Sequence, residues 1–155
     1  MDFLRKYGFE AGKGRYYEEV LYSLALIYNI ANNALSVYLK DFGLTPARFN
    51  VLMAIKHQGK KEGVSQVEIS RSLIVTASNM TRLLDKLEKE GLIQRASQQG
   101  DRRVNFVLIS EKGSKILDRA WPGYEKKLRD LIKDLPQGKQ KSLAALLMEW
   151  FRKLE

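Results

Sequence analysis

Apolar residues recur at helical spacing in three long stretches of this chain. From Tyr16 to about Leu39 they alternate at intervals of three and four, which is the spacing of one helix face and of the seam between paired helices. Similar stripes predict a helix from Ser110 to about Asp134 and a last helix from about Gly138 to Leu154. The first stripe suits the core of its own subunit as well as a contact between subunits. The last stripe is large and needs a partner to cover it.

Pro122 lies inside the second of these helices. A proline has no amide hydrogen, and its ring clashes with the preceding turn. We therefore expect a kink or a break between Asp118 and Trp121.

The apolar pattern becomes shorter between the long helices. Thr45 and Pro46 supply an N-cap and a first helical position, and the helix that they begin is predicted to end at Gly59 in a left-handed conformation. Ser65 and Glu68 have the spacing of a capping box, in which each side chain bonds to the other residue's amide. A short helix over about residues 66–72 is expected to follow.

The segment over residues 76–90 predicts a further helix that ends at Gly91. Only Leu73 to Val75 separate it from the preceding short helix. Two helices joined by so tight a turn form a helix-turn-helix candidate.

The hydrophobic period changes from helix-like to strand-like after Gly91. Leu92 to Arg95 are extended in character, residues 97–101 form a polar turn, and residues 104–109 alternate as a strand does. The resulting β-hairpin directly follows the second helix of the pair, which is the position of a wing. The fold class expected is therefore mainly α, a winged helix-turn-helix.

Composition narrows the functions that this fold can serve. The 155 residues include 27 Lys and Arg against 18 Asp and Glu, a net charge of +9 spread over the whole chain, which favours a polyanionic partner. The absence of cysteine excludes thiolate metal sites and thiol redox sensing, and the single His57 disfavours a histidine metal site. No metal and no cofactor is expected. The first 14 residues contain no apolar run fit to be a signal peptide, and no apolar stretch of about 18 residues, as a membrane helix needs, is expected, so a cytoplasmic protein without membrane contact is expected.

The helix over residues 76–90 has a polar face suited to the major groove of DNA. Arginine and asparagine can read guanine and adenine there. The candidate reading residues on this face are Ser78, Asn79, Thr81, Arg82 and Lys86. The alternative is an ordinary solvated face, with Arg82 paired to Asp85 one turn along.

The hairpin and the short helix add candidate contacts to the same duplex. Arg102 and Arg103 follow Asp101 at the turn, from which they can enter a minor groove, although an exposed arginine pair could serve solubility alone. Phosphate contacts are predicted for Arg95 of the hairpin and for three residues of the short helix, Ser65, Gln66 and Arg71.

Two runs of residues carry a resemblance to a known family. Residues 78–95 read SNMTRLLDKLEKEGLIQR, and residues 101–113 read DRRVNFVLISEKG. The Thr-Arg-Leu helix core, the Glu-Gly-Leu-Ile exit and the Asp-x-Arg wing resemble, in order and spacing, the MarR family of multiple antibiotic resistance regulators. By this resemblance, Asp101 steadies Arg103 in the minor groove, while Arg102 occupies a variable position.

The resemblance also implies an assembly. Residues 1–44 and 111–155 would supply the dimerisation helices of a homodimer, and residues 45–110 the DNA-binding lobe. The dimer would bind a palindromic operator in double-stranded DNA, and the expected role is that of a repressor, either constitutive or released by a small aromatic or anionic effector. Candidate effector-pocket residues are Tyr28, Tyr38, Phe49 and Trp121, although aromatic residues at helical spacing are more often part of a core.

Two other classes of function are alternatives to DNA binding. An enzyme is not expected, because the chain has no cysteine, one histidine and no glycine-rich phosphate loop. A winged helix that serves as a protein-interaction module without DNA binding is the main alternative, since it would need neither Arg103 nor a basic helix face.

Overall fold

A computed structural model describes residues 5–8, 14–59, 63–73, 75–98 and 101–155. Its elements follow the expected order, with the additional two-residue strand β1. They are α2 (Tyr16–Lys40), α3 (Pro46–Gln58), β1 (Val64–Ser65), α4 (Gln66–Leu73), α5 (Ala77–Lys89), β2 (Ile93–Gln98), β3 (Asp101–Ile109), α6 (Glu111–Ile132) and α7 (Gln137–Leu154). The mainly α winged helix-turn-helix class is confirmed. The chain divides into two compact units, residues 1–34 and 35–155, which are described separately below.

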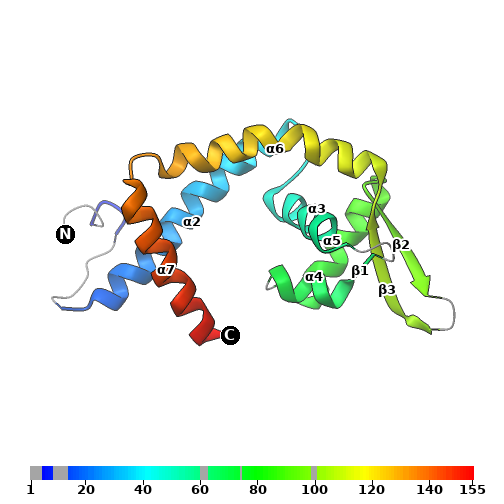
Figure 1. Ribbon diagram of the computed structural model, residues 1–155, viewed down its shortest axis with the longest axis horizontal. Coiled ribbons are helices and arrows are strands. Elements are labelled where there is room, and N and C mark those ends of the chain that lie inside the picture. Colours follow the sequence, from blue (N-terminus) through cyan, green and yellow to red (C-terminus); the bar gives the residue numbers. More distant parts are fainter. Residues whose placement is uncertain (1–4, 9–13, 60–62, 74, 99–100) are drawn as a thin grey trace. The chain divides into compact units, whose positions relative to one another are not determined.

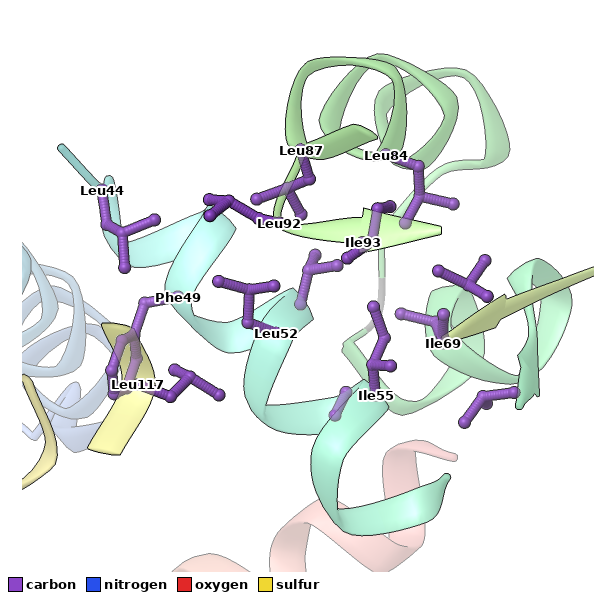
Figure 2. Close-up of a cluster of buried hydrophobic side chains, with 14 of the residues drawn as sticks. Leu44, Phe49, Leu52, Ile55, Ile69, Leu84, Leu87, Leu92, Ile93 and Leu117 are labelled. Atoms are coloured by element: carbon purple, nitrogen blue, oxygen red, sulfur yellow. The ribbon is translucent and has the colours of Figure 1, made fainter. Parts of the chain in front are cut away.

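The core of the second unit forms around α3. Leu52 and Ile55 of this helix are 0% and 1% exposed, and Figure 2 shows side chains from α4, α5 and the start of β2 surrounding them. On the other side Phe49 of α3 meets Leu117 of α6, which is also 1% exposed. The lobe therefore has one continuous apolar interior, to which the start of α6 contributes.

A three-stranded antiparallel sheet carries the wing. Its strand order is β1-β3-β2, and Val64 of β1 pairs with Val107 of β3. The hairpin of β2 and β3 begins directly after α5, where Gly91 has a positive φ of 70° that ends the helix. Strand β1 was not predicted, because two residues cannot show an alternating pattern.

The prediction for Gly59 was wrong, and of the two alternatives for Pro122, a kink or a break, the break is not formed. Gly59 has a φ of −64°, so its backbone is not left-handed; a Cβ there would lie 2.4 Å from the carbonyl oxygen of Ile55, and close approach is the reason for glycine. Helix α6 is not broken at Pro122 but runs without interruption from Glu111 to Ile132 (Figure 1).

Tyr38 of α2 supports α6 beside this proline. Its hydroxyl donates a hydrogen bond of 2.9 Å to the carbonyl oxygen of Ala120. The next residue after the proline, Gly123, leaves the room that this contact needs, since a Cβ there would lie 2.2 Å from the Tyr38 hydroxyl oxygen. Packing from a second helix thus holds α6 continuous where one backbone hydrogen bond is missing.

The first unit consists mainly of the N-terminal part of α2. Large apolar side chains are exposed there, among them Tyr28 at 67% and Ile27 at 62%. The helix includes an 18-residue window of mean hydropathy 1.3 with at most two charged residues, so by length and composition it could cross a membrane. This corrects the expectation that no stretch of the chain meets that criterion.

Helix α7, in the second unit, has no buried residue. Leu146 and Leu154 on its apolar stripe are 65% and 70% exposed, and Leu131 near the end of α6 is 41% exposed. Apolar area of this extent on two helices is typical of an interaction surface.

A substitution at Gly113 of α6 tests the close contact between this helix and the start of the wing. A Cβ at position 113 would lie 2.1 Å from the backbone carbonyl oxygen of Leu92. We expect Gly113→Ala to lower the free energy of unfolding by about 1–3 kcal/mol in chemical denaturation, although alanine favours helices. Gly138→Ala on α7 is the matched control, because nothing lies within 4 Å of its Cβ, and it should be neutral or stabilising. A stable Gly113→Ala protein would contradict the packing.

Candidate nucleic-acid interface

The N-terminus of α4 is fixed by the capping box expected from the sequence. The amide of Ser65 donates to the Glu68 carboxylate at 2.9 Å, and the amide of Glu68 donates to the Ser65 hydroxyl at 3.2 Å. The Ser65 hydroxyl also donates to that carboxylate at 2.7 Å. The predicted capping is confirmed, and it orients the first turn of the helix-turn-helix pair.

A side-chain hydrogen bond joins the two helices of the pair. Gln66 of α4 donates from Nε2 to the Thr81 hydroxyl of α5 at 2.8 Å, and that hydroxyl donates to the carbonyl of Ala77 at 3.0 Å. The structure thus brings these two predicted site residues together. Their polar groups set the position of α5 against α4.

The outward face of α5 carries polar side chains that are free to bind a partner. Met80, Leu84 and Leu87 are 0% exposed and hold the opposite face in the core. All five predicted reading residues are exposed on α5, namely Ser78, Asn79, Thr81, Arg82 and Lys86. Within the described residues, the side chains of Asn79, Arg82 and Lys86 have no hydrogen bond or ion pair.

The alternative pairing of Arg82 with Asp85 is not formed. Asp85 instead accepts from Arg95 of β2, with 2.6 Å between Nη2 and Oδ1. The other terminal nitrogen of Arg95 lies 3.2 Å from Glu88, and the arginine side chain is 27% exposed. The side chain of Arg95 therefore links the hairpin to α5, and it is already bound to two carboxylates.

A buried arginine holds the C-terminal end of α5. Arg48 of α3 is 4% exposed, pairs with the Glu90 carboxylate and donates to the Gly43 carbonyl at 2.9 Å. Burial lowers the pKa of Arg48 through desolvation of its charged form. On the same end of α5, Lys112 donates to the Glu90 carbonyl at 2.8 Å.

Sequence reasoning missed this attachment. The available signal was a charged residue on the apolar stripe of a helix, since Arg48 precedes Val51 and Leu52 by three and four residues. A charge in that position needs a buried partner.

For the wing arginines, Arg102 and Arg103, the structure describes the backbone alone. Residues 101–103 begin β3, and Asp101 is paired with Gln98 of β2. The side chains of Asp101, Arg102 and Arg103 lie outside the described residues, so their predicted contacts are not tested. Arg71, at the end of α4, is exposed and lines a cavity of about 780 Å³ between this helix pair and the end of α7.

The four aromatic residues proposed for an effector pocket have different surroundings. Tyr28 belongs to the first unit, and Phe49 is 1% exposed with its ring centroid 4.4 Å from that of Tyr124. Tyr38 is hydrogen-bonded to α6, as described above. Trp121 is 40% exposed and lines a pocket of about 280 Å³ between α3 and α6.

Charged side chains also line the pocket at Trp121. Lys56 and Asp118 lie across from each other with 2.5 Å between Nζ and Oδ1, and His57 is also part of the wall. Met53 and Leu117 supply apolar surface. Behind the tryptophan, burial raises the pKa of Tyr124.

Known proteins share this arrangement. The model of the MarR family matches residues 42–104 of the chain, from the turn between α2 and α3 into β3. The "HTH-type transcriptional regulator MhqR" of Bacillus subtilis is 28% identical over 114 residues, which cover 74% of this chain and 77% of the relative.

Two solved structures are similar in fold and contain DNA. One is a mutant of MarR from E. coli in complex with operator DNA, with a TM-score of 0.78, 23% identity, and 84% and 92% of the two chains covered. The other is the MepR–DNA complex of S. aureus, with a TM-score of 0.78, 20% identity, and 85% and 96% covered. At these identities the structures show a common fold.

Arg48 provides a test of the attachment of α5 to α3. In Arg48→Met, the Glu90 carboxylate and the Gly43 carbonyl lose their buried donor, so we expect a loss of about 2–4 kcal/mol in the free energy of unfolding by urea titration. Lys115→Met is the matched control, because it breaks a pair with Glu111 whose side chains are 71% and 82% exposed. The control should change stability by less than about 1 kcal/mol. Equal effects of the two substitutions would show that the Arg48 pair has no special role.

Proposed function

We propose that the chain is a sequence-specific transcriptional regulator of the MarR family that binds duplex DNA as a homodimer. The observation that carries this proposal is the outward face of α5, where Asn79, Arg82 and Lys86 have no partner among the described residues. These side chains present the donors and acceptors that read base edges in a major groove. We call α5 the recognition helix from here on.

In the proposed complex, the wing binds in the neighbouring minor groove. Arg103 would enter that groove and Asp101 would steady it, with Arg102 beside the phosphates. Ser65 and Gln66 would lie near a phosphate at the N-terminal end of α4, because the positive end of a helix dipole attracts anions. Residues 45–110 would thus form the DNA-binding lobe.

Residues 1–44 and 111–155 would form the dimer. The exposed apolar stripe of α7 and the exposed apolar residues at the end of α6 support this, since each would be covered by a second copy. The apolar face of α2 would be covered in the same way rather than by a bilayer. A twofold dimer requires a palindromic operator, and a protein acting on DNA is placed in the cytoplasm.

The regulator would act as a repressor that a small effector releases. The pocket at Trp121 supports an aromatic anion as that effector, because an aromatic ring can stack on the indole while Lys56 supplies a cation. Such an anion would have to compete with Asp118 for the lysine. We propose no enzymatic activity, in keeping with relatives that are named as regulators.

Salt titration tests DNA binding. A duplex selected from a random library by the wild-type protein should bind with an affinity whose logarithm falls with log salt by about 0.9 for each phosphate contact. Arg82→Ala should cost about 1–3 kcal/mol of discrimination at one base pair of this duplex. Arg119→Ala removes the same charge from the exposed face of α6 and serves as the control. Negligible duplex binding even at low salt would leave the protein-interaction module as the function.

Sedimentation tests the dimer. We expect a dimer at micromolar concentration, and we expect Leu146→Glu/Leu154→Glu to shift it toward monomer because four charges would enter an apolar contact across two copies. Lys141→Glu, a charge change on the same helix, is the control and should remain dimeric. A wild-type protein that sediments as a monomer would contradict the assembly.

A further inference from the structure

One arginine side chain forms ion pairs between the wing strand β2 and the recognition helix. Arg95 lies on β2, and its two terminal nitrogens contact Asp85 at 2.6 Å and Glu88 at 3.2 Å. These acidic residues are three positions apart on α5 and therefore lie on one face of the helix. One planar guanidinium thus holds two carboxylates, which a lysine ammonium could not do with the same geometry.

This arrangement differs from the phosphate contact predicted for Arg95 from the sequence. Both terminal nitrogens already bind carboxylates, and Nε is enclosed without a hydrogen-bond partner among the described residues. A phosphate would have to displace Asp85 or Glu88. The displaced carboxylate would then face the polyanion without a counter-ion.

The two acidic residues also need a cation for local reasons. Glu88 lies in the last turn of α5, where the helix dipole disfavours negative charge. The side chains of Asp85 and Glu88 are 55% and 41% exposed, so their negative charge would repel a duplex bound by this helix. Arg95 offsets these charges and at the same time fixes the helix to the hairpin.

We propose that Arg95 is a positioning residue for DNA reading. It holds the recognition helix at a set angle to the wing, so that α5 meets the major groove while the hairpin meets the minor groove. Its contribution is to sequence discrimination and not to the number of phosphate contacts. This inference rests on the proposed DNA-binding function.

The test compares wild type, Arg95→Met, Arg95→Lys and Asp85→Asn on two duplexes of equal length over a range of salt concentrations. One duplex is selected by the wild-type protein from a random library, and the other is unselected. The readouts are the ratio of the two affinities and the dependence of log affinity on log salt for the unselected duplex. Arg129→Met, which breaks a pair of 2.9 Å with Glu125 on α6, is the matched control.

We expect Arg95→Met to lower the affinity ratio about tenfold while the salt dependence stays unchanged. Asp85→Asn should lower the ratio as well. A variant that combines Arg95→Met with Asp85→Asn should lose little more than Arg95→Met, because both substitutions break one interaction. Arg95→Lys should keep the salt dependence but recover the ratio only in part. Arg129→Met should change neither readout.

Other outcomes overturn the inference in distinguishable ways. If Arg95→Met reduces the salt slope by about 0.9, or if the ratio is unchanged, Arg95 does not act by positioning, while DNA binding stands. If Arg95→Met melts at the assay temperature, Asp85→Asn decides alone, since a direct phosphate contact predicts an unchanged ratio for it. If the wild-type protein shows no salt-dependent duplex binding, this inference and the proposed function both fail.

Discussion

The recognition helix can offer a polar face to DNA because its other face is held in the core. Met80, Leu84 and Leu87 are fully buried against the elements around α3, and each contributes about 1.5–3 kcal/mol by leaving water. This burial sets the rotation of α5 about its own axis. The exposed positions of Asn79, Arg82 and Lys86 follow from that rotation, so the apolar contact decides which side chains can be read out.

Apolar packing alone leaves the tilt of such a helix adjustable, and polar contacts at both ends of α5 restrict it. Gln66 and Thr81 join it to α4, while Arg48 and Lys112 hold its C-terminal end to α3 and α6. The contact with Lys112 links the recognition helix directly to the start of a long helix that we assign to the dimer. A shift of α6 would therefore change the position of the C-terminal end of α5 through this contact.

Unlike α5, the long helices α2 and α7 leave most of their apolar residues exposed. Helix α7 has an apolar stripe but no buried residue, and α2 has exposed aromatic side chains along its N-terminal part. A helix of this kind gains little stability from its own subunit, because helices derive most of their stability from tertiary contacts. Its surface is explained by a partner, and this requirement connects the fold of one chain to the symmetry of its proposed DNA site.

The sequence by itself determined the order and type of the elements, since periodicity, caps and turn residues act over a few neighbours. The N-caps at Thr45 and Ser110, the capping box at Ser65 and the polar face of α5 were all readable in this way. The tertiary structure alone decided the partner of Arg95, the burial of Arg48 and the continuity of α6 at Pro122. Each depends on a contact between separate elements of the fold, and such a contact forms only when packing brings those elements together.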